Sequence, residues 1–383
     1  MPRHPELVPS LAAIGGSVFS SLAHRLAAHE GEVYPLHVGD TWLEPAEGCR
    51  MEDLSVAEHP GMHRYAPPQG LPALLERIAA RAERRMGVPT SPEDVLVAAG
   101  ATGALGAVCG AVVAPGEQVL LAAPYWPLIP GIVRCFHGEP VPVPLIGAAG
   151  SPEEAVARLE AARTERTAAL YVNSPNNPTG KVLPPAWLEA IAAWARAKGL
   201  WLIADEVYED YVYQGEHRYV RSLAPERTFS AHSFSKAYGM AGNRCGYVIG
   251  PREAMPELRK VSTHAFYATP TASQLAAVRA LDGAGDAWVE RVRPLYRELG
   301  RRAAEKLGVP PPEGSTFLFL DVRSALDERG LLGFLERCAD RGLFLAPGPS
   351  FGPYPTHVRV CFTSAEPERV ERGLAVLAEL LAG

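Results

Sequence analysis

The pattern of apolar and polar residues between about residues 90 and 250 alternates between two kinds of segment. Apolar runs of strand length lie at 94–99, 118–123, 168–172, 200–205 and 245–250. Between them, apolar residues recur at helical spacing, as at 184–198, where Trp187, Leu188, Ile191 and Trp194 share one face. Alternation of strands and helices predicts an α/β fold, with a mostly parallel sheet covered by helices on both faces.

The pattern changes beyond about residue 285. Long charged helical stretches at 286–307 and 366–382 flank two short β-like segments, 315–322 and 357–362. This order predicts a smaller α+β domain that the N-terminal segment joins. We expect the following division: 41–284 in the large domain, with 1–40 and 285–383 in the small domain.

Composition narrows the class of protein. The 383 residues are 47% hydrophobic and 21% charged, which is typical of a globular protein, and the net charge of -6 argues against binding to nucleic acid or an anionic membrane. No apolar stretch reaches the length of a membrane span, and 11–23 is interpreted as an amphipathic helix rather than a signal segment. The six cysteines are scattered without a CxxC motif, which favours reduced thiols in the cytoplasm and no metal site.

Ligands of open α/β sheets bind beyond the carboxyl ends of the strands, so the residues that follow each apolar run are the candidates for a site. After 94–99 comes the glycine-rich "GATGALG", whose backbone amides and Thr102 could hold a phosphate at a helix N-terminus. A purely structural turn explains this segment equally well. After 118–123 comes Trp126, which is either a core residue or a stacking surface.

Three more candidates follow the next two runs. Asn177 lies in the turn "NSPNNPTG" and could offer an amide donor to a ligand. Alternatively, the turn is only a rigid structural loop. Asp205 ends the apolar run "LWLIA", where a buried carboxylate requires a partner. Tyr208 follows it closely. A helix cap or a local salt bridge is the alternative explanation for Asp205.

Lys236 lies among small residues in "SFSKAYGMAGNR", with no carboxylate nearby, and Arg244 follows eight positions later. Either charge could simply be exposed to solvent. Alternatively, Lys236 is an amine nucleophile and Arg244 binds a phosphate. A pyridoxal phosphate site requires these groups together: an amine, a carboxylate, an amide donor, an aromatic ring that stacks on the cofactor, and a phosphate-binding loop.

The order of these motifs resembles that of the class I/II aminotransferases, pyridoxal-phosphate enzymes of fold type I that include aspartate aminotransferase. The resemblance covers essentially the whole chain. It rests on "YAPPQGLPALLERIA", "GATGAL", "PYW", "NSPNNPTG", "ADEVYEDY", "SFSKAYGMAGNRCGY" and "VRVCF".

The resemblance implies a role for each candidate around the cofactor. Lys236 corresponds to the Schiff-base lysine, and Asp205 to the partner of the pyridine nitrogen. Tyr208 and Asn177 correspond to the residues that hydrogen-bond the phenolic oxygen. The remaining cofactor contacts implied are stacking by Trp126 and phosphate binding by Ala101, Thr102, Ser233 and Arg244.

The resemblance also implies substrate and subunit contacts. Arg359 corresponds to the arginine that binds the substrate's α-carboxylate, and Gly39 to its backbone helper. Tyr65 corresponds to a tyrosine that crosses a dimer interface to the neighbouring subunit's phosphate, so a homodimer with shared active sites is expected.

The expected reaction is transfer of an amino group between an L-amino acid and a 2-oxo acid. Neutral or aromatic donors are favoured, because Thr102 and His264 occupy positions where acid-specific relatives carry a cation. An aspartate-preferring aminotransferase, a C–S β-lyase, a cyclopropane-forming synthase and a decarboxylase remain alternatives on the same site. A nicotinamide dehydrogenase is disfavoured, because the glycine-rich loop lacks the GxGxxG fingerprint.

Overall fold

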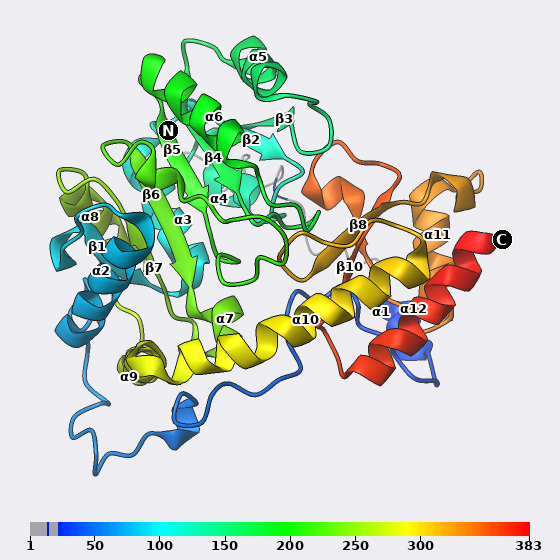
Figure 1. Ribbon diagram of the computed structural model, residues 1–383, viewed down its shortest axis with the longest axis horizontal. Helices are drawn as coiled ribbons and strands as arrows, with labels where there is room; N and C mark the ends of the chain where they lie inside the picture. Colours follow the sequence, from blue (N-terminus) through cyan, green and yellow to red (C-terminus); the bar gives the residue numbers. More distant parts are fainter. Residues whose placement is uncertain (1–13, 15–21) are drawn as a thin grey trace, which may run out of the picture.

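The computed structural model describes residue 14 and residues 22–383, and it places a large mixed sheet between layers of helices (Figure 1). The expected helix at 11–23 lies mostly outside the described residues. The large sheet has the strand order β1-β7-β6-β5-β4-β2-β3. Its strands are β1 (Val95–Ala98), β2 (Gln118–Ala123), β3 (Glu139–Pro144), β4 (Thr167–Asn173), β5 (Trp201–Asp205), β6 (Thr228–Ser233) and β7 (Gly246–Ile249).

The sheet is mostly parallel, as predicted, with one exception. Strands β2 to β6 pair in parallel, whereas β7 runs antiparallel to both β6 and β1. The apolar pattern missed β3 and β6. β3 reads "EPVPVP" and lies at the edge of the sheet, where proline is tolerated, and β6 reads "TFSAHS", whose polar side chains hide its burial.

Side chains along the buried strands point alternately to the two faces of the sheet and form one apolar layer on each face. Tyr171, Ile203 and Phe229 pack on the side of α3 (Gly100–Val112), whereas Leu170 and Leu202 pack on the side of α6 (Pro185–Ala197). The other helices of this part are α2 (Pro72–Met86), α4 (Ile129–Cys135), α5 (Pro152–Ala162), α7 (Phe234–Ala237), α8 (Met255–Ala265) and α9 (Thr271–Arg279).

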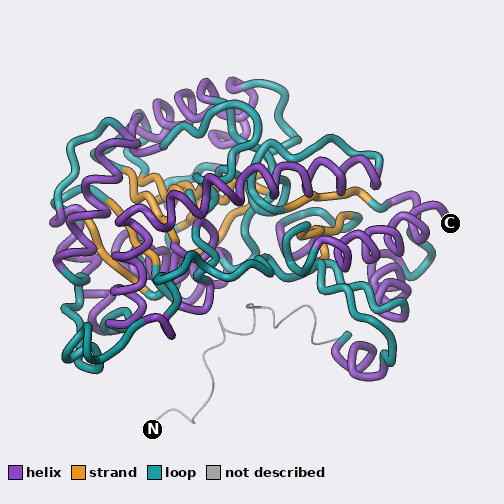
Figure 2. The backbone as a smooth tube through the Cα atoms, turned by 60° about the horizontal axis from the view of Figure 1, so that its bottom comes forward, coloured by secondary structure: helices purple, strands orange, loops and turns teal. Residues whose placement is uncertain are grey.

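The C-terminal part is built on a three-stranded antiparallel sheet, β8-β10-β9, which lies beside the large sheet (Figure 2). Its strands are β8 (Phe317–Asp321), β9 (Ala346–Pro347) and β10 (His357–Cys361). The helices around it are α1 (Ala23–Ala28), α10 (Gly285–Leu307), α11 (Gly330–Asp340) and α12 (Pro367–Ala382).

The N-terminal segment contributes to this smaller part, because Tyr34 forms a parallel bridge with Leu343. The long helix α10 runs from below the large sheet to the C-terminal helices (Figure 1). It follows a π-helical turn, Ala280–Ala284, in which Gly283 has φ 116°. The division at residues 41–284 stays a prediction. Among the described residues, no helix is both long enough and apolar enough to cross a membrane.

Candidate active site

A cleft lies at the carboxyl ends of the central strands, beside the start of α3. It encloses about 610 Å³ of empty space, open mouth included. Nine of the residues predicted for the cofactor line it: Ala101, Thr102, Trp126, Asn177, Asp205, Tyr208, Ser233, Lys236 and Arg244. They come from segments far apart in the chain, and the parallel sheet brings them together because its strand ends share one edge.

Lys236 lies on the short helix α7, directly after β6, and is half-buried. Its Nζ donates a hydrogen bond to the carbonyl of Gly39, which comes from the N-terminal segment. Burial lowers the pKa of the ammonium, the cations Arg359 and Arg244 lower it further, and Asp40 opposes them. A lysine with a lowered pKa is suited to act as an amine nucleophile or as a base.

Asp205 ends β5 on the α3 side of the sheet and is 3% exposed. Burial raises the pKa of its carboxyl group to about 6, although a hydrogen bond from Tyr171 opposes the shift. From the residues that the structure describes, its Oδ1 accepts only a long bond, 3.4 Å, from the backbone amide of Val207. No charged side chain among the described residues contacts this carboxylate directly, and it could receive a cationic ligand group from the cleft.

Backbone segments approach one another closely at the end of the cleft where Gly246 meets the N-terminus of α3. A Cβ on Gly246 would lie 2.6 Å from the carbonyl carbon of Gly100 and 2.7 Å from the amide nitrogen of Ala101. Arg244 donates to the carbonyl of Ala99 over 3.3 Å, and this bond holds its guanidinium beside the N-terminus of α3. The helix dipole and the guanidinium both favour an anion here, so the predicted phosphate cradle fits.

Asn177 and Tyr208 lie on the substrate side of the cleft and are 4% and 2% exposed. The amide oxygen of Asn177 accepts a hydrogen bond from Arg359 over 2.9 Å, which leaves its NH₂ group as a donor toward a ligand. Burial raises the pKa of the Tyr208 hydroxyl, so this group stays protonated at neutral pH. Both side chains therefore present donors that match a phenolic oxygen.

Arg359 lies on β10 and is 6% exposed. Its Nη2 donates to the carbonyl of His37 over 2.6 Å, and its guanidinium carbon lies 4.3 Å from the ring centre of Phe317 and 5.0 Å from that of Phe351. The Nε is buried and finds no hydrogen-bond partner among the described residues. A buried, unsatisfied cationic donor fits a carboxylate ligand.

The remaining predicted residues lie outside the cleft lining. Gly39 lies next to the cleft, as the acceptor for Lys236. Tyr65 is 85% exposed and packs only edge-on against Tyr267, with ring centres 4.9 Å apart, so it is not brought to its own chain's cleft. His264 is exposed at the end of α8.

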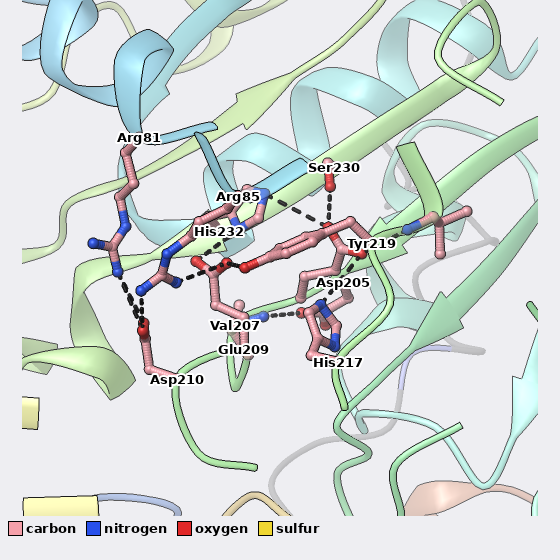
Figure 3. A network of polar contacts seen from close by, with 12 residues as sticks. Arg81, Arg85, Asp205, Val207, Glu209, Asp210, His217, Tyr219, Ser230 and His232 are labelled. Atoms are coloured by element: carbon pink, nitrogen blue, oxygen red, sulfur yellow. Dashed lines mark hydrogen bonds and ion pairs between the residues drawn. The ribbon is translucent and has the colours of Figure 1, made fainter. Parts of the chain in front are cut away.

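A network of buried charged side chains supports the segment after Asp205 (Figure 3). Glu209 accepts a hydrogen bond from Tyr219 over 2.6 Å and interacts with His232 at 3.1 Å. Asp210 pairs with Arg85 at 2.6 Å and with Arg81 at 3.2 Å, which joins the segment to α2. Because Tyr208 lies between Asp205 and Glu209, the network fixes the backbone that carries both candidate site residues.

Several residues of the site were not predicted from the sequence. Tyr171, Asn173 and Ser235 contribute to the cleft or to its floor. A hydroxyl within the apolar run "AALYV" was the one signal for Tyr171. For Ser235, proximity to Lys236 was the signal. Among the described residues, no cluster of His, Cys, Asp and Glu could hold a metal ion, and all six cysteines are free thiols.

The fold and the cleft bring together a buried lysine, a buried carboxylate and a place that favours an anion, which is the arrangement expected of an enzyme that binds a phosphorylated cofactor. The family model for aminotransferase class I and II matches residues 35–377. The aspartate/prephenate aminotransferase of Thermus thermophilus is 35% identical over 331 residues, with 84% of each chain covered. The arginine–pyruvate transaminase of Pseudomonas aeruginosa is 35% identical, with 99% of each chain covered.

Solved structures give the same result. A structure of aspartate aminotransferase from Thermus thermophilus with maleate aligns with a TM-score of 0.88 and 30% identity, covering 98% of this chain and 100% of the other. The N-succinyldiaminopimelate aminotransferase of Mycobacterium tuberculosis aligns with a TM-score of 0.87 and 29% identity over the same shares. The chain therefore belongs to the class I and II aminotransferase family. It is a pyridoxal-phosphate-dependent transaminase of fold type I, as its sequence motifs predicted.

Proposed function

We propose that this transaminase works through Lys236 as its reactive amine and Asp205 as the partner of the cofactor's ring nitrogen. The observation that carries the proposal is their meeting in one cleft with Arg244 and the N-terminus of α3. Thr102, Ala101 and Ser233 would complete the phosphate contacts. Trp126 would stack on the ring, and Tyr208 and Asn177 would donate to its phenolic oxygen.

When bound, pyridoxal phosphate supplies an electron sink that stabilises negative charge at the substrate's Cα. The chain's own residues move the proton and orient the substrate. Lys236 Nζ, as a neutral amine, takes the proton from Cα, and its lowered pKa increases the fraction of the amine that is neutral. Arg359 holds the α-carboxylate, with the backbone of Gly39 as its helper, so that Cα is presented to Lys236 in a fixed orientation.

We further propose that neutral or aromatic amino acids are better donors than aspartate. Thr102 lines the cleft without a charge, and His264 lies on the exposed end of α8. The apolar groups near Arg359 are aromatic rings, Phe317 and Phe351. The relatives include an aspartate/prephenate aminotransferase and an arginine–pyruvate transaminase, so they do not select a donor. An aspartate-preferring enzyme is the second candidate.

The proposed active unit is a homodimer with shared active sites. Tyr65 is 85% exposed and its ring lies against that of Tyr267, which is 45% exposed; Phe266, the residue before Tyr267, is 41% exposed. Large aromatic side chains exposed together are typical of a protein interface. In the dimer, Tyr65 would reach the phosphate of the neighbouring subunit.

Covalent trapping tests the assignment of the amine. Borohydride reduction of the yellow enzyme, followed by peptide mapping, should label Lys236 alone. Lys236→Ala should abolish turnover but still bind the cofactor non-covalently. The matched control is Lys198→Ala, because Lys198 is an ordinary ion-paired lysine that contacts Glu160 at 3.1 Å. A label on any lysine other than Lys236 would contradict the proposal.

Single-turnover measurements test the donor class. The enzyme loaded with cofactor is mixed with aspartate, alanine, methionine or phenylalanine, and the bleaching of its visible absorbance is followed. Phenylalanine, methionine or alanine should react faster than aspartate. If aspartate reacts about tenfold faster than the others, the preference is wrong, although the assignment of Lys236 would stand.

A further inference from the structure

Tyr171 and Asp205 form a buried pair in the floor of the cleft, and the roles described so far do not include Tyr171. Its Oη donates a hydrogen bond to Oδ2 of Asp205 over 2.6 Å. Tyr171 has no exposed surface, and Asp205 is 3% exposed. β4 and β5 pair with Asn173 opposite Asp205, so Tyr171, two residues earlier on the same face, lies diagonally across from the carboxylate.

We propose that Tyr171 is a positioning residue that keeps Asp205 ionised and in one orientation for its contact with the cofactor's ring nitrogen. This inference rests on the proposed function, in which Asp205 makes that contact. The hydroxyl engages Oδ2 with a short, well-formed bond, whereas Oδ1 accepts only the 3.4 Å contact from the Val207 amide. Tyr171 therefore fixes one oxygen of the carboxylate and leaves the other available.

The surroundings of Asp205 explain why a donor is needed. Burial opposes the charged form of the carboxyl group, and Glu206, the next residue, raises its pKa further. His232 on β6 and the bond from Tyr171 lower it. A hydrogen bond to a carboxylate stabilises its charged form, so loss of the hydroxyl would shift the balance toward protonation.

The Tyr171 hydroxyl can donate this hydrogen bond to Asp205 at every physiological pH. Burial and the adjacent Asp205 raise the pKa of Tyr171 well above its ordinary value, and the nearby Tyr208 and Cys109 raise it further. Tyr171 thus remains protonated and remains a donor. A phenylalanine would fill the same space without donating, so Tyr171→Phe isolates the hydroxyl.

The experiment measures cofactor affinity rather than turnover. Apoprotein is titrated with pyridoxal phosphate, or with its 1-deaza analogue, which has carbon in place of the ring nitrogen, and tryptophan fluorescence reports binding from about pH 5.5 to pH 8.5. The variants are Tyr171→Phe and, as the matched loss of a buried hydroxyl, Tyr213→Phe, whose Oη donates to the carbonyl of Ser315 over 2.6 Å.

Tyr171→Phe should move the acidic limb of pyridoxal phosphate affinity upward by about one pH unit, since one hydrogen bond to a charged group is lost. Affinity for the analogue should not change, and Tyr213→Phe should behave as wild type. Replacement of Tyr171 by 3-fluorotyrosine, a stronger donor, should move the limb to lower pH. Equal weakening for both ligands, or an unmoved limb, would overturn the inference.

A last variant separates this inference from the function on which it rests. Asp205→Asn should remove the preference of the apoprotein for pyridoxal phosphate over the analogue. If the preference disappears but Tyr171→Phe leaves the limb in place, only the role of Tyr171 is wrong. If Asp205→Asn retains the full preference, the assignment of Asp205 falls, and the role of Tyr171 falls with it.

Discussion

Replacement of Arg359 by lysine should weaken substrate binding while the fold and the cofactor site stay intact. A guanidinium has five N–H donors in a planar fork, whereas an ammonium is a point charge with three. In the structure, one N–H goes to Asn177 over 2.9 Å and one to the carbonyl of His37 over 2.6 Å. Subtracting these two from five leaves three donors, including the buried Nε, for the substrate's α-carboxylate.

The expected magnitude follows from these contacts. Lysine keeps the positive charge but loses the second hydrogen bond of a bidentate contact with the carboxylate. One hydrogen bond between charged groups contributes about 1.5–3 kcal/mol, which corresponds to a fall in kcat/KM of roughly 10- to 150-fold. Most of the change should fall on KM, because the α-carboxylate is bound in the ground state and in the transition state alike.

Steady-state kinetics with phenylalanine and with alanine would measure the effect, and both donors should lose by a similar factor because both carry the same α-carboxylate. Affinity for pyridoxal phosphate should not change. Arg372→Lys is the matched control, since Arg372 pairs with Glu32 at 2.6 Å on the surface and its side chain is 53% exposed. That variant should stay within about twofold of wild type.

Two results would refute this reasoning. If Arg359→Lys keeps kcat/KM within about twofold of wild type, the guanidinium is not the carboxylate contact, and its buried Nε must have another partner in solution. If the variant instead loses cofactor affinity in proportion to activity, Arg359 supports the cleft rather than the substrate.

Other predictions follow from backbone packing, charge and assembly. Gly246→Ala should lower the free energy of unfolding by about 2 kcal/mol or more, because the new Cβ would lie 2.6 Å from a backbone atom. The control Gly242→Ala should leave it unchanged, because a Cβ there has nothing within 4 Å. Equal free energies of unfolding in urea for the two variants would contradict this. Burial opposes the charge on His232, but Glu209 and Glu206 outweigh it and raise its pKa. The stability that protonated His232 contributes should therefore be complete below about pH 6.5 and be lost as the pH rises through the raised pKa of His232. Between about pH 6 and pH 9, the unfolding free energy of wild type should approach that of His232→Gln. Mixing Lys236→Ala with Tyr65→Phe should restore activity through hybrid dimers, and a fully active monomer in sedimentation would exclude shared sites.

The periodicity of apolar residues was enough to predict the α/β class and most of the central strands, because burial on both faces leaves continuous apolar runs that are visible in sequence. The strands β3 and β6 were not predicted, since prolines at an edge and polar residues within β6 break that pattern. The antiparallel direction of β7 also escaped, because direction depends on how the connection from β6 returns across the sheet and not on the composition of the strand.

The candidate chemistry was readable where residue type and position were both unusual. Lys236 among small residues and Asp205 at the end of an apolar run were predicted from the sequence, and the motif order supplied the family. Only the tertiary structure decided which side chains lie against these two. The bond from Tyr171 to Asp205 depends on the register between β4 and β5, and the buried Nε of Arg359 depends on packing against distant aromatic rings. Contacts between segments far apart in sequence are set by the packing of the whole chain, and a linear pattern does not carry that information.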